Sequence, residues 1–72
     1  RKGDVWMEIV VNGRRERLEE SMSILQYLSV KGLSPERIVV EYNCAVVKKE
    51  DLGNIILKEN DQLEVLRCVG GG

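Results

Sequence analysis

The stretch Met7-Glu-Ile-Val-Val-Asn-Gly-Arg-Arg-Glu-Arg-Leu18 predicts a β-hairpin. Ile9 and Val11 fall on one face of its first strand, because successive side chains of a strand alternate between faces. Asn12-Gly13 follows directly, and both residues tolerate the positive φ that a two-residue type I′ turn requires. The return strand is highly charged and only Leu18 clearly points inward. These charges suit a strand at the exposed edge of a sheet.

A single helix is expected next, from Ile24 to about Lys31. Ser23 is preferred to Ser21 as the N-cap residue, since a serine side chain can accept from the first free backbone N–H groups. The residues with helical spacing are Ile24, Tyr27, Leu28 and Lys31. Gly32 can adopt the left-handed conformation that ends a helix, and Pro35 prevents continuation.

The remaining sequence predicts further strands. Their expected ranges are 38–42, 45–47 and 63–69, with a short apolar run at 55–57. A turn is expected at Asn43-Cys44 and another at residues 58–61. A hairpin, a helix and then more strands predict an α+β fold: a ubiquitin-like β-grasp, with a four- or five-stranded mixed sheet packed on one main helix. The first and last strands would then pair in parallel at the centre.

Bulk composition restricts the function classes. The chain has 72 residues, 43% of them hydrophobic and 32% charged, with a formal net charge of -1. This balance lacks the basic character of nucleic-acid binding or of a polybasic membrane patch. Apolar runs are too short to span a bilayer, and no signal peptide is visible, so a cytoplasmic protein is expected. A domain of this size also has little room for a deep substrate pocket.

The cysteine and histidine content argues against catalysis and metal binding. Cys44 and Cys68 match no zinc or redox spacing, and both are expected to be free thiols that act as small hydrophobes. Histidine is absent, which removes the commonest metal ligand and general base. No phosphate-binding loop is present. A stand-alone enzyme is therefore a poor interpretation, and no bound cofactor or metal is expected.

The most informative feature is the run of glycines after Val69. A Gly-Gly tail can lie extended in a channel too narrow for any side chain. The carboxylate of Gly72 is then sterically open to an attacking atom, but it is a poor electrophile until a group such as AMP is attached. This chemistry requires an enzyme partner that binds ATP. The plain alternative is that the glycines are a frayed end or a cloning remnant.

Domain organisation is derived from these assignments. One β-grasp domain is expected over residues 7–69, and a flexible reactive tail at residues 70–72. Residues 1–6 differ in character from the rest of the chain. They are interpreted as an N-terminal extension, or as residues added before a natural start at Met7.

Four stretches carry a resemblance to a known family. They are Met7-Glu-Ile-Val-Val-Asn-Gly13, Gly32-Leu-Ser-Pro-Glu-Arg37, Val40-Glu-Tyr-Asn43, and Asp61-Gln-Leu-Glu-Val65 leading to Val69-Gly70-Gly71-Gly72. In their order and spacing they resemble the thiamine-biosynthesis sulfur carriers, ubiquitin-like β-grasp proteins of the ThiS type. The resemblance covers the chain from Met7 to Gly72.

The resemblance implies a role for the tail. An E1-like, ThiF-like enzyme would use ATP to adenylate Gly72, and a cysteine desulfurase relay would supply sulfur. A ThiG-like thiazole synthase would consume the resulting thiocarboxylate to build the thiazole ring of thiamine. Gly72 would carry the sulfur, and Gly71, Gly70 and Val69 would be threaded into the partner. Val39 and Leu66, apolar on the sheet face away from the helix, are candidate partner contacts.

The sequence departs from the family pattern at three places. Cys44 replaces a common glycine, Cys68 replaces a large apolar residue, and Asn60 replaces a glycine. Asparagine is the natural substitute where φ is positive. None of these departures touches the diglycine. Cys68 is also close enough in sequence to Gly72 for a relay thiol, an interpretation that ranks far below an inert thiol.

Three other functions remain open from the sequence. The chain could be a sulfur carrier for another pathway, such as molybdopterin synthesis or cysteine or tRNA thiolation. It could instead be a ubiquitin-like modifier joined to lysines through Gly72. A plain interaction module is the third alternative, and it would tolerate loss of Gly71-Gly72.

Overall fold

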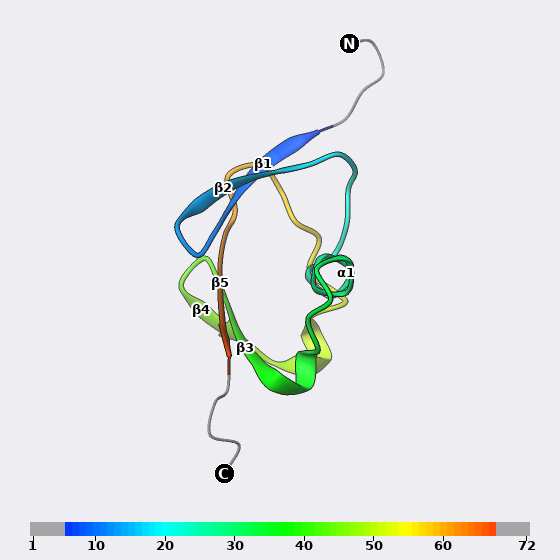
Figure 1. Ribbon diagram of the computed structural model, residues 1–72, viewed down its shortest axis with the longest axis vertical. Helices are drawn as coiled ribbons and strands as arrows, with labels where there is room; N and C mark the ends of the chain where they lie inside the picture. Colours follow the sequence, from blue (N-terminus) through cyan, green and yellow to red (C-terminus); the bar gives the residue numbers. More distant parts are fainter. Residues whose placement is uncertain (1–5, 68–72) are drawn as a thin grey trace.

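The computed structural model describes residues 6–67, which form a mixed five-stranded sheet and one α-helix (Figure 1). Strands β1 (Met7–Val11) and β2 (Arg14–Leu18) pair antiparallel as a hairpin. Asn12 and Gly13 have φ values of 52° and 82°. Both lie in the left-handed region, as a type I′ turn requires. The hairpin and its turn are therefore confirmed.

Helix α1 (Ile24–Val30) is fixed at both ends by its own caps. The Ser23 hydroxyl accepts from the Gln26 N–H at 3.0 Å, and the Gln26 side chain accepts from the Ser23 N–H at 2.9 Å. This reciprocal pair is a capping box. At the other end Gly32 has φ 73°, and its N–H and that of Leu33 donate to Ser29 and Leu28. Such a left-handed Schellman ending satisfies carbonyls that a short helix would otherwise expose.

The sheet order is β2-β1-β5-β3-β4. Strand β3 (Ile38–Tyr42) pairs antiparallel with both β4 (Ala45–Val47) and β5 (Gln62–Arg67). Strand β5 also pairs in parallel with β1, so it is the central strand. The expected parallel centre and the β-grasp class are confirmed, with five strands rather than four. Strand β5 begins one residue earlier than expected, and residues 68 and 69 lie outside the described part.

One face of the sheet is covered by α1 (Figure 1). The helix buries Ile24, Tyr27 and Leu28, the three apolar positions that helical spacing predicted. Opposite them lie the inward side chains of the strands, and two loop residues close the core. The other buried apolar residues are Ile9, Val11, Leu18, Ile38, Val40, Leu52, Leu57 and Leu63. Burying a side chain of this kind contributes about 1.5–3 kcal/mol, so this single layer of contacts holds the sheet and helix together.

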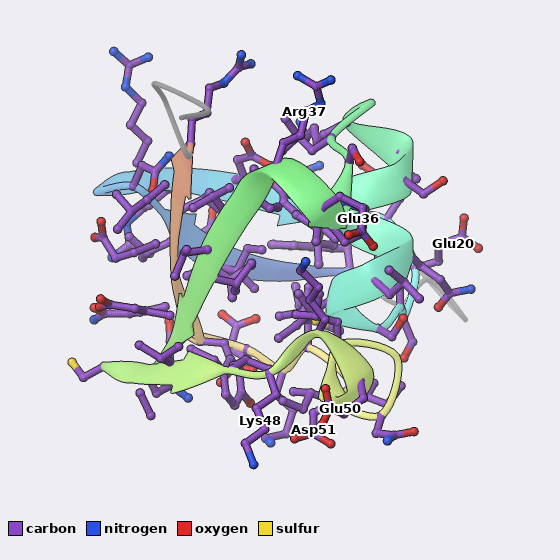
Figure 2. The ribbon with its side chains drawn as sticks, turned by 90° about the horizontal axis from the view of Figure 1, so that it is seen from below. Glu20, Glu36, Arg37, Lys48, Glu50 and Asp51 are labelled. Atoms are coloured by element: carbon purple, nitrogen blue, oxygen red, sulfur yellow. The ribbon has the colours of Figure 1, made fainter. Side chains whose placement is uncertain are left out.

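The loops contain two short 3-10 helices that sequence reasoning did not anticipate. They are η1 (Pro35–Arg37) and η2 (Lys49–Asp51), and the side chains of Lys49 and Glu36 join them in an exposed ion pair at 3.1 Å. Figure 2 shows Glu50 and Asp51 on η2, on the opposite side of the molecule from Arg37, which directly precedes β3. The apolar run 55–57 forms no strand and contributes one isolated bridge, between Ile56 and Ser23.

The turn between β3 and β4 corrects one expectation. Asn43 and Cys44 have φ values of 49° and 77°, and the Cys44 thiol is free and exposed. The predicted turn and the predicted free thiol are confirmed for Cys44, but its treatment as a small hydrophobe is wrong, because the side chain is exposed. The two central residues of a type I′ hairpin turn project beyond the end of the sheet, where no core can form around them. Asn60 has φ 69°, so its expected left-handed conformation is confirmed.

The left-handed conformation of Cys44 predicts a stabilising substitution. A Cβ at this φ costs roughly 1–2 kcal/mol, and glycine removes that cost while adding freedom to the unfolded chain. Cys44→Gly is expected to raise the free energy of unfolding by about 0.5–1 kcal/mol, measured by urea denaturation. Cys44→Ala keeps the Cβ and is the matched control, for which no comparable gain is expected. A Cys44→Gly protein less stable than the alanine variant would contradict this interpretation.

Candidate functional site

The residues predicted to react, Gly72, Gly71, Gly70 and Val69, lie outside the described residues, as does Cys68. The structure instead defines the base from which this segment continues. That base is the end of β5 at Arg67, together with the two sheet faces and the turns around it. The candidate site is built from these elements.

Strand β5 is held on both sides. Its antiparallel register with β3 runs from Tyr42↔Leu63 to Ile38↔Arg67. Its parallel pairing with β1 is shorter and stops at Val11↔Leu63. Beyond that point the Asn12 side chain takes over, because its Oδ1 accepts from the Val65 N–H at 2.8 Å. Hydrogen bonding between the β1 hairpin and β5 therefore continues two residues beyond Leu63, as far as Val65.

A second turn asparagine secures the beginning of β5. The Asn43 Oδ1 accepts from the Gln62 N–H at 2.8 Å, and the Asn43 N–H donates to the Gln62 carbonyl. Next to it the nearly buried Asp61 carboxylate accepts from the Tyr42 hydroxyl at 2.7 Å and the Lys58 N–H at 2.8 Å. Burial, and then the bond to Asp61, raise the pKa of the Tyr42 phenol, while nearby Lys58 opposes the shift. The Asp61 carboxylate is thus fully engaged in holding this end of the strand.

On the helix side, a groove of about 270 Å³ lies beside the end of β5. Its lining residues are Val11, Asn12, Glu16, Tyr27, Lys31, Leu33, Val65 and Arg67. The Tyr27 hydroxyl donates to Glu16 Oε1 at 2.7 Å, and the Lys31 ammonium lies 3.3 Å from the same oxygen. This chain of contacts joins β2 to the C-terminal end of α1. It fixes the helix against the sheet edge and commits these three polar side chains to one another.

The environment of Tyr27 perturbs its ionisation. Burial in the core, and then the hydrogen bond to the Glu16 carboxylate, raise the pKa of the Tyr27 phenol far above its ordinary value of 10.0. Both causes disfavour the phenolate, one by loss of water and the other by negative charge. The role of Tyr27 is structural, because its hydroxyl already donates a hydrogen bond to Glu16.

The face of the sheet opposite the helix carries exposed apolar and acidic side chains. Val39 of β3 and Leu66 of β5 are direct cross-strand partners, and they are 38% and 48% exposed. Glu41 and Glu64 form the next pair on the same face. These four residues are named the outer-face patch. Val39 and Leu66 thus lie on the face away from the helix, as predicted. That they are direct partners, and that two carboxylates oppose each other beside them, could not be recognised without the β3–β5 register.

Among residues 6–67 no group of three or more histidine, cysteine or carboxylate side chains could hold a metal ion. In the same range no helix is long and apolar enough to cross a membrane. What the arrangement does provide is a rigid central strand that leads into the glycine tail, with an exposed patch beside it. The fold and this base define the class as a ubiquitin-like β-grasp protein.

The chain belongs to the ThiS family, whose family model matches residues 7–72. A crystal structure of the thiamine biosynthesis protein ThiS from Geobacter metallireducens superposes with a TM-score of 0.79 at 30% identity, over 92% of this chain and all of that one. Two thiazole synthases are also similar: that of Magnetococcus marinus is 38% identical and that of Paramagnetospirillum magneticum 29% identical, each over 66 residues. The chain spans about a fifth of the length of either synthase. Membership of this family supports a sulfur-carrier role.

The contact between Asn12 and Val65 predicts a local effect on β5. Asn12→Gly keeps a residue that accepts φ 52° but removes the acceptor, and Asn12→Asp keeps both. Asn12→Gly is expected to lower the free energy of unfolding by about 1 kcal/mol and to speed hydrogen exchange of the Val65 amide. Asn12→Asp is the matched control and should retain the protection. Equal exchange at Val65 in both variants would show that the side chain does not hold the strand.

The raised pKa of Tyr27 predicts loss of stability in alkali. In the unfolded chain the phenol releases its proton near pH 10, whereas the folded chain retains it. The unfolded state then binds fewer protons, so stability is fully present below pH 10 and falls as pH rises from there through the folded pKa. Tyr27→Phe should flatten this alkaline fall in urea denaturation curves recorded from about pH 8 to 11. An unchanged slope in that variant would contradict the assignment.

Proposed function

We propose that this chain is a sulfur carrier for thiazole formation in thiamine biosynthesis. It serves as a protein co-substrate and its partners supply the catalysis. The observation that carries the proposal is the family match, which extends over residues 7–72 and so includes the diglycine. The similarity to two thiazole synthases favours the thiamine pathway over molybdopterin synthesis or thiolation.

In the proposed reaction, the Gly72 carboxylate attacks the α-phosphorus of ATP on a ThiF-like enzyme, and pyrophosphate leaves. The terminal sulfur of a persulfide, delivered by a cysteine desulfurase relay, then attacks the acyl carbon and displaces AMP, which gives an acyl disulfide. A thiol reductant supplies the two electrons that cleave its S–S bond. One carboxylate oxygen departs with AMP and sulfur takes its place, which leaves a thiocarboxylate. A ThiG-like thiazole synthase would use this group as its sulfur source. Activation is needed because a free carboxylate repels nucleophiles.

The residues of the tail have separate roles in this proposal. Gly72 carries the adenylate and then the sulfur, whereas Gly71, Gly70 and Val69 are threaded into the partner's active site. Glycine suits the last positions, since any Cβ would crowd the acyl carbon and its attacker. Asn12 and the β3 register hold β5 as far as Arg67, so the partner meets a fixed platform. Ordering the remaining residues costs conformational entropy, which contacts within the partner would offset.

The test is the intact mass of the chain ending at Gly72 after incubation with ATP, cysteine, a cysteine desulfurase, a thiol reductant and the ThiF-like enzyme of the same organism. The expected result is a gain equal to one sulfur in exchange for one oxygen. A chain lacking Gly72 should show no gain. Persulfides on Cys44 or Cys68 add a whole sulfur atom, and a Cys44→Ser/Cys68→Ser variant should retain the exchange product.

Two outcomes would redirect the proposal. Failure of the full chain to gain sulfur, with an enzyme proven active on its own carrier, would reject the carrier function. Covalent conjugates to lysines of other proteins, dependent on Gly72, would instead identify a ubiquitin-like modifier.

A further inference from the structure

The outer-face patch combines exposed apolar surface with two carboxylates that form no ion pair with any other residue in the range 6–67. Glu64 is exposed, Glu41 is partly exposed, and the two are direct cross-strand partners. Residues directly opposite on one sheet face have Cβ atoms only about 5 Å apart, and like charges in such a pair are destabilising. Within residues 6–67, no lysine or arginine lies within ion-pair distance of either carboxylate.

The neighbours of the two carboxylates are apolar. Val39 and Leu66 form the next cross-strand pair toward the end of β5. On the other side Val46 of β4, 67% exposed, is the direct partner of Glu41. The paired carboxylates are thus bordered by apolar side chains on this face, where water is easily displaced by a docked protein. Desolvation strengthens a charge contact there, provided that the partner supplies the cation.

We propose that the outer-face patch is the docking surface for the adenylating enzyme, and that Glu41 and Glu64 together bind an arginine which that enzyme presents between apolar side chains. A planar guanidinium has enough donors to bond both carboxylates at once. The inference rests on the proposed function, because it assigns this face to the enzyme that activates Gly72. It goes beyond that function by naming the recognition chemistry.

The position of the patch suits the enzyme that receives the tail. Leu66 precedes Gly72 by six residues, which span at most about 20 Å when fully extended. An enzyme that holds the Gly72 carboxylate in its active site therefore meets the protein close to this patch.

The negative charge of the patch favours a basic enzyme surface over a second copy of the chain or a nucleic acid. A second copy of the chain would bring an identical acidic pair against this one in a two-fold interface, and the four carboxylates would repel. Nucleic acid is repelled for the same reason. A basic protein surface offsets the repulsion between Glu41 and Glu64 in the isolated chain. The two glutamates therefore lower the stability of the isolated chain but stabilise the complex.

The experiment compares the full chain with Glu41→Gln/Glu64→Gln. Glu20→Gln is the matched control, because Glu20 is exposed and lies beside α1 on the far side of the helix from the strands (Figure 2). Dissociation constants are measured by calorimetry against the ThiF-like enzyme of the same organism. The double variant is expected to bind at least about tenfold more weakly, with a flatter dependence on salt, whereas the control binds as the unmodified chain.

Thermal unfolding supplies the second readout. Removing the like-charge pair should leave the melting temperature of the double variant unchanged or raise it by about 1 to 3 °C. Weaker binding by a protein of undiminished stability cannot come from misfolding. Unchanged affinity of the double variant for the adenylating enzyme would overturn the inference, whatever its affinity for thiazole synthase.

The intact-mass measurement separates the two possible failures. If the unmodified chain gains sulfur and the double variant binds equally well, the docking inference fails and the carrier function stands. If the unmodified chain gains no sulfur, the carrier function itself fails.

Discussion

The structure depends on the double pairing of β5, which lies between β1 and β3 at the centre of the sheet. This arrangement holds the last described strand from both sides. Because β5 leads directly into the glycine tail, the rigid part of the molecule reaches almost to the predicted reactive group. A tail on an edge strand would leave its base free to separate from the sheet. Central placement would give the proposed partner a fixed surface and a short connection to Gly72.

Two asparagines, Asn12 and Asn43, hold β5 in the sheet through their side chains. Each occupies a left-handed position in a two-residue turn, and each turns its side-chain oxygen to an amide of β5. Asparagine therefore suits both positions for two reasons: it tolerates the left-handed backbone, and its side chain accepts a hydrogen bond from β5. Cys44 differs from the two asparagines, because its backbone is left-handed but its exposed thiol forms no hydrogen bond within residues 6–67. Because the core lies on the helix side, the side chains of Val39 and Leu66 stay exposed on the outer face.

Most of the fold could be predicted from local signals. The Asn12-Gly13 turn, the Ser23 cap and the Gly32 ending are set by residues within a few positions of one another, and all three are confirmed. The 3-10 helices were missed because their short turns have no apolar period. The turn at Asn43-Cys44 was predicted from its residues and is confirmed, whereas the treatment of Cys44 as a small hydrophobe followed from residue type alone, and the thiol is exposed. The opposition of Glu41 and Glu64 depends on the β3–β5 register between distant segments, which no local pattern encodes. The tail residues, predicted from chemistry and family resemblance, lie beyond the described part and stay a prediction.

The central claim is that a partner enzyme activates the carboxylate of Gly72, and isotope exchange tests it most directly. The ThiF-like enzyme is incubated with ATP and labelled pyrophosphate, with and without the chain. Reversible formation of an acyl adenylate predicts that label enters ATP only when the chain ending at Gly72 is present, and that deletion of Gly72 abolishes the exchange. Exchange that proceeds equally with the truncated chain would contradict the account.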